Sequence, residues 1–254
     1  MSLLHAEYLK LSRRRLYYAM VLILAALVGL LAFVLLVFPR IAPDFAEGVP
    51  LLEKPEAYVF GAQQVAAQTW FPLILAVVML GSEFGSTVWA TALTRDPRRT
   101  VQISARFAVL ATASFLAIVA GVIGWALVTA VAVPGQGGPA MSDWLALVWK
   151  LALIELAWTA IGLGAVAMLR SVGPAIGAAL ALYFIDPILG LWGPWENVSL
   201  SAASTALFQL DVPGGFGALV PGADLSLTHA VVIVLGWTAL GLVVTWWGLR
   251  RRDA

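Results

Sequence analysis

A few polar side chains interrupt otherwise apolar segments, and they are the first candidates for chemistry. Glu155 lies eleven residues after Trp144 in the apolar stretch 144–169, about 16 Å along a helix and so near the middle of a membrane. Ionisable groups at that depth are costly and mark functional sites by default. Two interpretations of Glu155 follow. Its side chain faces a cavity or another subunit, or its carboxyl is protonated and forms an interhelical hydrogen bond.

Two glutamines form a second polar feature. Gln64 and Gln68 stand four residues apart in the apolar stretch 59–81, followed by Pro72, which predicts a kink. On a helix they would share one face. That face could line a transport pathway, or it could be an interhelical contact surface. A third acid, Asp186, directly precedes Pro187 and is expected to be a residue near the end of its helix rather than a proton relay.

The sequence lacks the motifs that usually mark a nucleotide-binding, metal-binding or catalytic site. The three lysines are Lys10, Lys54 and Lys150, and none follows a glycine, so the usual phosphate-binding loop is absent. The sequence has no cysteine, and its two histidines, His5 and His229, are expected on opposite sides of the membrane. We expect no catalytic residue, no metal site and no cofactor bound by this chain.

The elements that carry these residues follow from composition. The chain is 61% hydrophobic and 11% charged over 254 residues, whereas soluble domains have roughly 45–50% apolar and about 25% charged residues. Such an excess of apolar surface has to face lipid. A span needs about 20 apolar residues. Six stretches satisfy this length, and they predict one all-α transmembrane domain over residues 1–254: 16–38, 59–81, 107–131, 144–169, 174–191 and 227–249.

The basic residues predict the orientation of the spans. Four precede the first span, four lie between the second and third, Arg170 follows the fourth, and three follow the last, whereas the opposite side holds only Arg40 and Lys54. Basic loops remain in the cytoplasm. Both termini are therefore expected in the cytoplasm.

The amino-terminal segment has an amphipathic pattern. Leu4, Tyr8 and Leu11 share one helical face, while Glu7 and Lys10 lie on another. A basic helix of this kind lies in the headgroup layer. The pattern predicts an interfacial helix, and the alternative is a flanking segment that only sets topology.

The outer segment 192–226 has tryptophans but no lysine or arginine. It predicts either an interfacial loop anchored by Trp192 and Trp195 or an extracellular gate, with a short helix within 199–210.

The loop 82–106 between the second and third spans is the most informative stretch. Trp89, Ala92 and Leu93 form an apolar edge beside charged residues, and Asp96-Pro97 ends the segment. This composition favours a short helix that docks on a cytoplasmic partner, against an ordinary solvated loop.

The same stretch resembles permease subunits of bacterial ABC exporters, the type-two ABC membrane family. The resemblance rests on Glu83-Phe84, Thr87, Leu93-Thr94 and Pro97-Arg98-Arg99, and it extends to the six-span layout and the terminal run 250–252. Ser86-Thr87 stands where the family has Gly-Thr.

The resemblance implies the partners and their roles. Two six-span subunits, identical or not, would each dock on a separate ATP-binding subunit that holds ATP and Mg²⁺, in the plasma membrane of a bacterium and surrounded by lipid, without nucleic acid. The coupling contacts would be Glu83, Phe84, Thr87, Arg98 and Arg99. This chain would convert motor closure into movement of the spans. The sequence does not identify the cargo.

Two other functions are also consistent with the sequence. An ion-coupled secondary transporter would use Glu155 or Asp186 as its ion site. A membrane assembly or immunity partner would bind proteins without transport.

Overall fold

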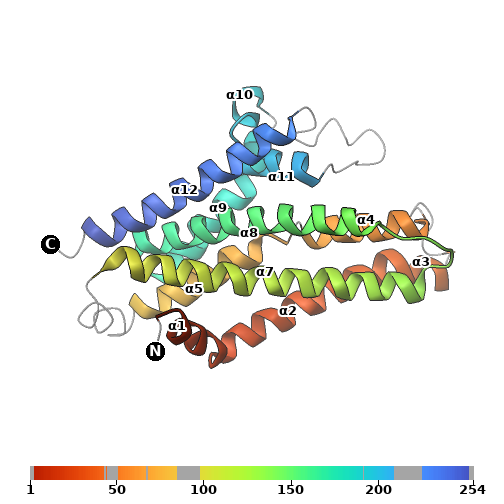
Figure 1. The fold of residues 1–254 in the computed structure, drawn as a ribbon, viewed down its shortest axis with the longest axis horizontal. Coiled ribbons are helices and arrows are strands. Elements are labelled where there is room, and N and C mark those ends of the chain that lie inside the picture. Colours follow the sequence, from red (N-terminus) through yellow and green to blue (C-terminus); the bar gives the residue numbers. More distant parts are fainter. Residues whose placement is uncertain are drawn as a thin grey trace. The chain divides into compact units, whose positions relative to one another are not determined.

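The computed structural model describes residues 3–42, 44, 51–66, 68–84, 98–190, 192–208 and 225–251. Within these ranges all regular secondary structure is helical (Figure 1). The helices are α1 Leu3–Ser12, α2 Arg15–Ala32, the π-helix η1 Phe33–Val37, α3 Phe38–Ile41, α4 Lys54–Ala66, α5 Trp70–Phe84, α7 Arg99–Ala132, α8 Met141–Leu169, α9 Val172–Gly190, α10 Gly193–Glu196, α11 Leu200–Phe208 and α12 Leu227–Arg251.

Six stretches of the described chain are long and apolar enough to cross a membrane, which confirms the expected number and suits a multi-pass membrane protein. Their bounds are Arg15–Ile41, Lys54–Phe84, Thr100–Ala132, Met141–Leu169, Val172–Gly190 and Leu227–Arg250. Along α2, large apolar side chains such as Leu22 and Leu30 are exposed, as expected of a surface that contacts lipid. The sidedness of the spans and the membrane-surface position of α1 remain predictions.

The second of these stretches contains a break. α4 ends at Ala66 and α5 begins at Trp70, with Gln68 and Thr69 outside both helices. The proline kink was expected at Pro72, but Pro72 instead lies in the first turn of α5. A helix tolerates proline there because the first four N–H groups have no intrahelical partner in any case.

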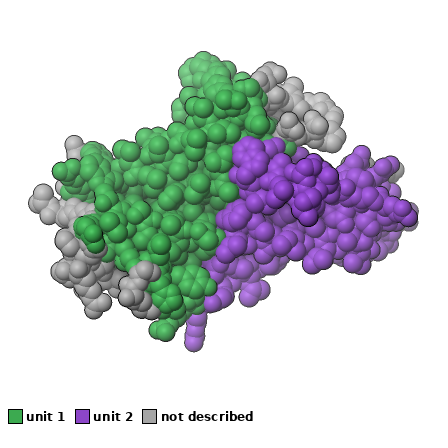
Figure 2. Space-filling model, in the orientation of Figure 1, with its two compact units in different colours: residues 1–14, 69–114, 152–254 green, residues 15–68, 115–151 purple. Residues whose placement is uncertain are grey.

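Two compact units make up the chain, coloured separately in Figure 2. Unit 1 comprises 1–14, 69–114 and 152–254, and unit 2 comprises 15–68 and 115–151.

Unit 2 is organised around one tryptophan. Trp125 of α7 is buried, and its indole N–H donates to the Ala57 carbonyl of α4 over 2.9 Å. Gly61, one turn further along α4, lies directly against the same indole, so that any Cβ would overlap it. Lys54 donates to the carbonyl of Ala130 near the end of α7, where a cation interacts favourably with the helix dipole.

In unit 1, the part of α8 from Ala152 onward packs closely against two other helices. Gly162 of α8 packs against α5, with the position of a Cβ 2.5 Å from the Leu73 carbonyl oxygen. Gly241 of α12 packs as closely on α8, where a Cβ would lie 2.6 Å from the Ala160 carbonyl carbon. Small residues allow membrane helices to approach this closely.

Asp186 joins α9 to the short helix α11. Its buried carboxylate accepts hydrogen bonds from the indole of Trp195 (3.0 Å), the hydroxyl of Ser199 (3.1 Å) and the backbone N–H of Ser201 (2.7 Å). Ser199 also caps α11 by accepting from the N–H of Ala202. Asp186 lies in the last turns of α9, near its end as expected, and α11 falls within the predicted range 199–210.

The contact between Gly241 and Ala160 yields a stability test. Gly241→Ala should lower the free energy of unfolding by about 1–3 kcal/mol, because backbone atoms must move apart. Gly236→Ala on the same helix meets nothing within 4 Å and should be neutral or slightly stabilising. Thermal unfolding of both purified variants in one detergent measures the difference, and equal midpoints would contradict this packing.

Candidate functional site

A charged cluster, defined here as Glu7, Lys10, Glu83 and Arg106, joins α1 to the end of α5 and to α7. Arg106 donates through Nε (3.2 Å) and Nη2 (3.0 Å) to one oxygen of Glu83. The other Glu83 oxygen pairs with Lys10. Glu7 lies 3.5 Å from both cations. The cluster thus holds two positive and two negative charges that balance.

The centre of this charged cluster is removed from solvent. The side chains of Glu83 and Arg106 are each 4% exposed, and Gln102 of α7 accepts a further hydrogen bond from Arg106 Nη1 at 3.0 Å. A buried charge that loses its partner is strongly destabilising, whereas a complete pair is tolerated. The geometry at the end of α5 therefore depends on all members being present.

Charge also holds α1 in place. Of the ten residues of α1, Leu11 is the buried one, and it lines a cavity of about 20 Å³ with Met79 and Leu110, enough for about one water. Arg14, just beyond α1, donates to the hydroxyl of Ser82 in α5. Little apolar area secures this helix, so its position follows from the ionic contacts.

Phe84, next to Glu83, makes a second connection. The guanidinium of Arg170 lies 5.7 Å from the centre of the Phe84 ring, within cation–π range. Arg170 follows α8 with a φ of 50°, and its N–H donates to the carbonyl of Val166 (2.8 Å), which closes that helix. Its side chain also reaches the carbonyl of Gly248 in α12 (3.4 Å). The last residues of α5 thereby contact α1, α7 and the residue that follows α8, and Arg170 extends this connection to α12.

The predicted coupling residues divide into three groups. Glu83 and Phe84 belong to α5, because α5 and α7 both extend into the predicted loop 82–106. Glu83 is ion-paired with α1 and α7, and Phe84 contacts Arg170. Arg98, directly before α7, is exposed. Thr87 and the side chain of Arg99 lie outside the described part of the chain.

The two predicted pathway glutamines do not continue one helical stripe. Gln64 is half-buried in α4, while Gln68 lies beyond the end of that helix. The Gln68 amide donates back to the Gln64 carbonyl over 3.3 Å, one of the carbonyls that a helix end leaves without a partner.

Glu155 is buried in α8, with 1% of the residue exposed. Neither of its carboxyl oxygens has a hydrogen-bond partner among the described residues. Within that part of the chain, the structure shows no interhelical hydrogen bond to Glu155.

Sequence reasoning used Glu7, Lys10 and Arg106 only for amphipathicity and topology and missed that they meet Glu83. One signal was present. Glu83 and Arg106 flank the predicted ends of consecutive spans, which places opposite charges at one membrane level.

The ionic cluster predicts a pattern of stabilities. Arg106→Ala should cost about 3–5 kcal/mol of unfolding free energy, because Glu83 is left buried without its main partner. The double variant Glu83→Ala/Arg106→Ala should cost less, because the remaining Glu7 and Lys10 balance. Unfolding in detergent micelles by increasing denaturant measures these two variants together with Glu83→Ala, which completes the cycle.

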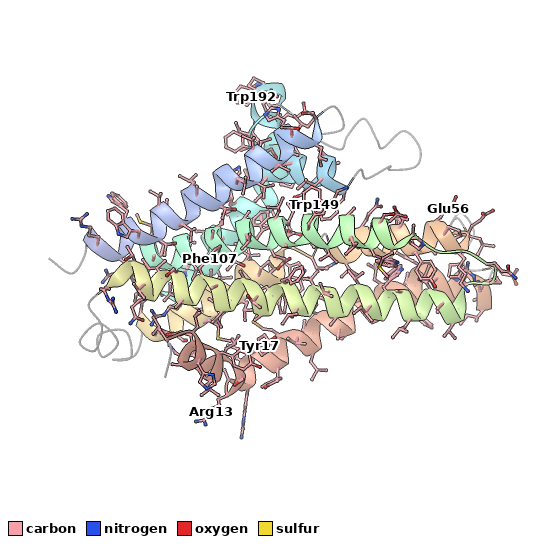
Figure 3. The ribbon with its side chains drawn as sticks, viewed as in Figure 1. Arg13, Tyr17, Glu56, Phe107, Trp149 and Trp192 are labelled. Atoms are coloured by element: carbon pink, nitrogen blue, oxygen red, sulfur yellow. The ribbon has the colours of Figure 1, made fainter. Side chains whose placement is uncertain are left out.

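Arg13→Ala is the matched control for this prediction. Arg13 is exposed and its side chain points away from the helices (Figure 3), so its replacement should change stability by less than about 0.5 kcal/mol. A double variant whose loss equals the sum of the two single losses would show that Glu83 and Arg106 are not coupled.

Comparisons with known proteins do not assign this chain to a family. No protein-family model matches it, and no curated protein matches it significantly. The interpretation of its function accordingly rests on the loop motif, the distribution of charge and the geometry of the two sites above.

Proposed function

We propose that the chain is the transmembrane subunit of an ATP-driven ABC exporter. It works with a separate ATP-binding subunit and a second permease copy, identical or not, in a bacterial plasma membrane. The observation that supports this proposal most is the buried charged cluster, in which Glu83 precedes the segment 85–97 and Arg106 follows it. A segment that receives force from a motor needs a rigid attachment at its ends, and this cluster supplies one.

The contacts suggest how the force spreads. ATP-driven closure of the two motors pushes on the segment 85–97, and the push arrives first at Glu83 and Phe84. Glu83 passes it to α1 and α7 through ion pairs, and Phe84 passes it through Arg170 to α12. Packed helices then move as rigid bodies between two states that nucleotide stabilises differently.

For Glu83 we propose the role of a positioning group, because its carboxylate is buried and ion-paired. The direct contacts with the ATP-binding subunit are proposed for Thr87, Arg98 and Arg99. Of these, Arg98 is exposed, as a docking contact requires.

The membrane-surface position of α1 belongs to the same proposal. Leu4 and Tyr8 are 51% and 60% exposed, and Arg13 and Arg15 directly after the helix are exposed as well. An exposed apolar face beside basic residues suits the headgroup layer of a negatively charged inner leaflet. This arrangement supports a cytoplasmic amino terminus.

The first test is purification of the tagged chain from native membranes in mild detergent. We expect an ATP-binding subunit to co-purify and the eluate to hydrolyse ATP in a vanadate-sensitive manner. Recovery of this chain alone, without nucleotide hydrolysis, under conditions that preserve other membrane complexes would refute the proposal.

Coupling can be tested once transport is reconstituted. Glu83→Ala combined with Arg98→Ala should reduce ATP-dependent export at least about tenfold, a loss of about 1.4 kcal/mol or more in coupling. Glu53→Ala, at an exposed acid outside this segment, should leave export unchanged. Undiminished export by the double variant would show that this segment does not couple the motor to the spans.

An ion-coupled secondary transporter is the second candidate. It is favoured by Glu155, which has no hydrogen-bond partner in the described ranges, and by the break between α4 and α5, because such transporters use discontinuous helices and buried acids. Transport that survives ATP depletion and stops when the proton gradient collapses would select it. An assembly or immunity partner would show neither transport nor stimulated ATP hydrolysis.

A further inference from the structure

One face of α8 carries three buried polar side chains with unsatisfied atoms. Both oxygens of Glu155, the indole nitrogen of Trp158 and the hydroxyl of Thr159 lack hydrogen-bond partners among the described residues. Each of the three residues is at most 3% exposed. Positions three and four apart are neighbours on a helix surface, so these groups form one patch, here called the Glu155 patch.

Neighbouring elements of unit 1 show what this face meets. The Trp158 ring contacts Tyr183 of α9 edge-on, with 5.4 Å between ring centres, and Tyr183 is hydrogen-bonded to Thr69, just before α5. Gly162, one turn further along the same face, packs on Leu73 of α5. The Glu155 patch therefore points toward α9 and the beginning of α5.

A purely structural role does not explain the patch. Interiors of folded proteins pair nearly all of their buried polar atoms, and the charged cluster and Asp186 in this chain follow that rule. A carboxyl that served packing would be paired in the same way, or an apolar residue would replace it. An ionisable side chain buried in a membrane-spanning helix is a candidate functional site by default, and Glu155 has no hydrogen-bond partner among the described residues.

The chemistry of the patch selects the ligand. The Glu155 carboxyl attracts positive charge once it releases its proton to an approaching cation, and the rings of Trp158 and Tyr183 attract cations through their faces. Lys150, five residues earlier on α8, lies about 140° around the helix and does not neutralise the patch. The remaining surface around Glu155 in α8 is apolar.

We propose that the Glu155 patch binds the positively charged group of an amphipathic organic cation, which is the substrate class of this exporter. This inference rests on the proposed function and adds the chemistry of the cargo. The patch is closed in this structure, so a substrate enters when α8 separates from its neighbours during alternation between the two states.

Two probes of one shape and opposite charge test the inference. Tetraphenylphosphonium is a lipophilic cation, and tetraphenylborate is the corresponding anion. Equilibrium dialysis against the detergent-purified full chain, with empty micelles subtracted, should show saturable binding of the cation and at least tenfold weaker binding of the anion. Equal binding of both probes would overturn the proposal.

Variants of Glu155 separate binding from folding. Glu155→Gln keeps the shape and removes the charge, so it should weaken tetraphenylphosphonium binding at least tenfold. Glu53→Gln, at an exposed acid, is the matched control and should bind as the unaltered chain does. Unchanged cation binding by Glu155→Gln would overturn the assignment of the site.

A leucine variant tests the structural alternative directly. Glu155→Leu should melt at the same temperature as the unaltered chain or higher, because an unpaired buried acid is replaced by an apolar residue. A melting temperature several degrees lower would show a structural role and overturn the proposal. The binding assay needs no ATP-binding subunit. Charge-selective binding without a co-purifying ATP-binding subunit would therefore support the cation site while refuting the exporter. A co-purifying ATP-binding subunit without charge-selective binding would refute only the cation site.

Discussion

The ion pair between Glu83 and Arg106 determines how the end of α5 can be built. Both charges are removed from solvent, and each is tolerable only while the other, together with Lys10 and Glu7, remains in place. The pair therefore fixes α5 relative to α7 and brings α1 with it, since α1 has little apolar area of its own to bury. The ion pair thereby fixes the position at which α5 ends.

Two kinds of buried polar group in unit 1 mark different roles. Asp186 and the charged cluster are fully paired, and each joins helices that are distant in sequence. Glu155 has no pair in the described structure, although it is as buried as Asp186. Hydrogen bonds and ion pairs therefore offset the cost of burial for the first group, whereas no such contact within the described residues offsets it for Glu155.

The sequence predicted what the membrane dictates and missed what tertiary contacts decide. The six spans follow from length and hydropathy, because lipid admits few other solutions. The sequence predicts a kink at Pro72 and no break between Ala66 and Trp70, since proline marks a disturbance of a helix without showing that a new helix begins there. Arg106 was counted toward topology, because an ion pair with Glu83 depends on the approach of two helices that no local pattern encodes. Glu155 is predicted as a candidate site from its expected depth, whereas its lack of a partner among the described residues depends on how the helices pack.

The helix α5 connects the charged cluster to the surroundings of Glu155. Glu83 and Phe84 end α5, while Thr69, just before its first residue, is hydrogen-bonded to the Tyr183 that contacts Trp158. A helix of 15 residues is about 22 Å long and nearly incompressible along its axis. Displacement of its anchored end must therefore appear at its beginning, beside the Glu155 patch. Because Gly162 leaves α8 in backbone contact with α5, movement of α5 cannot leave α8 undisturbed. In the proposed exporter, a push at the charged cluster would therefore change the packing around Glu155 through contacts between helices.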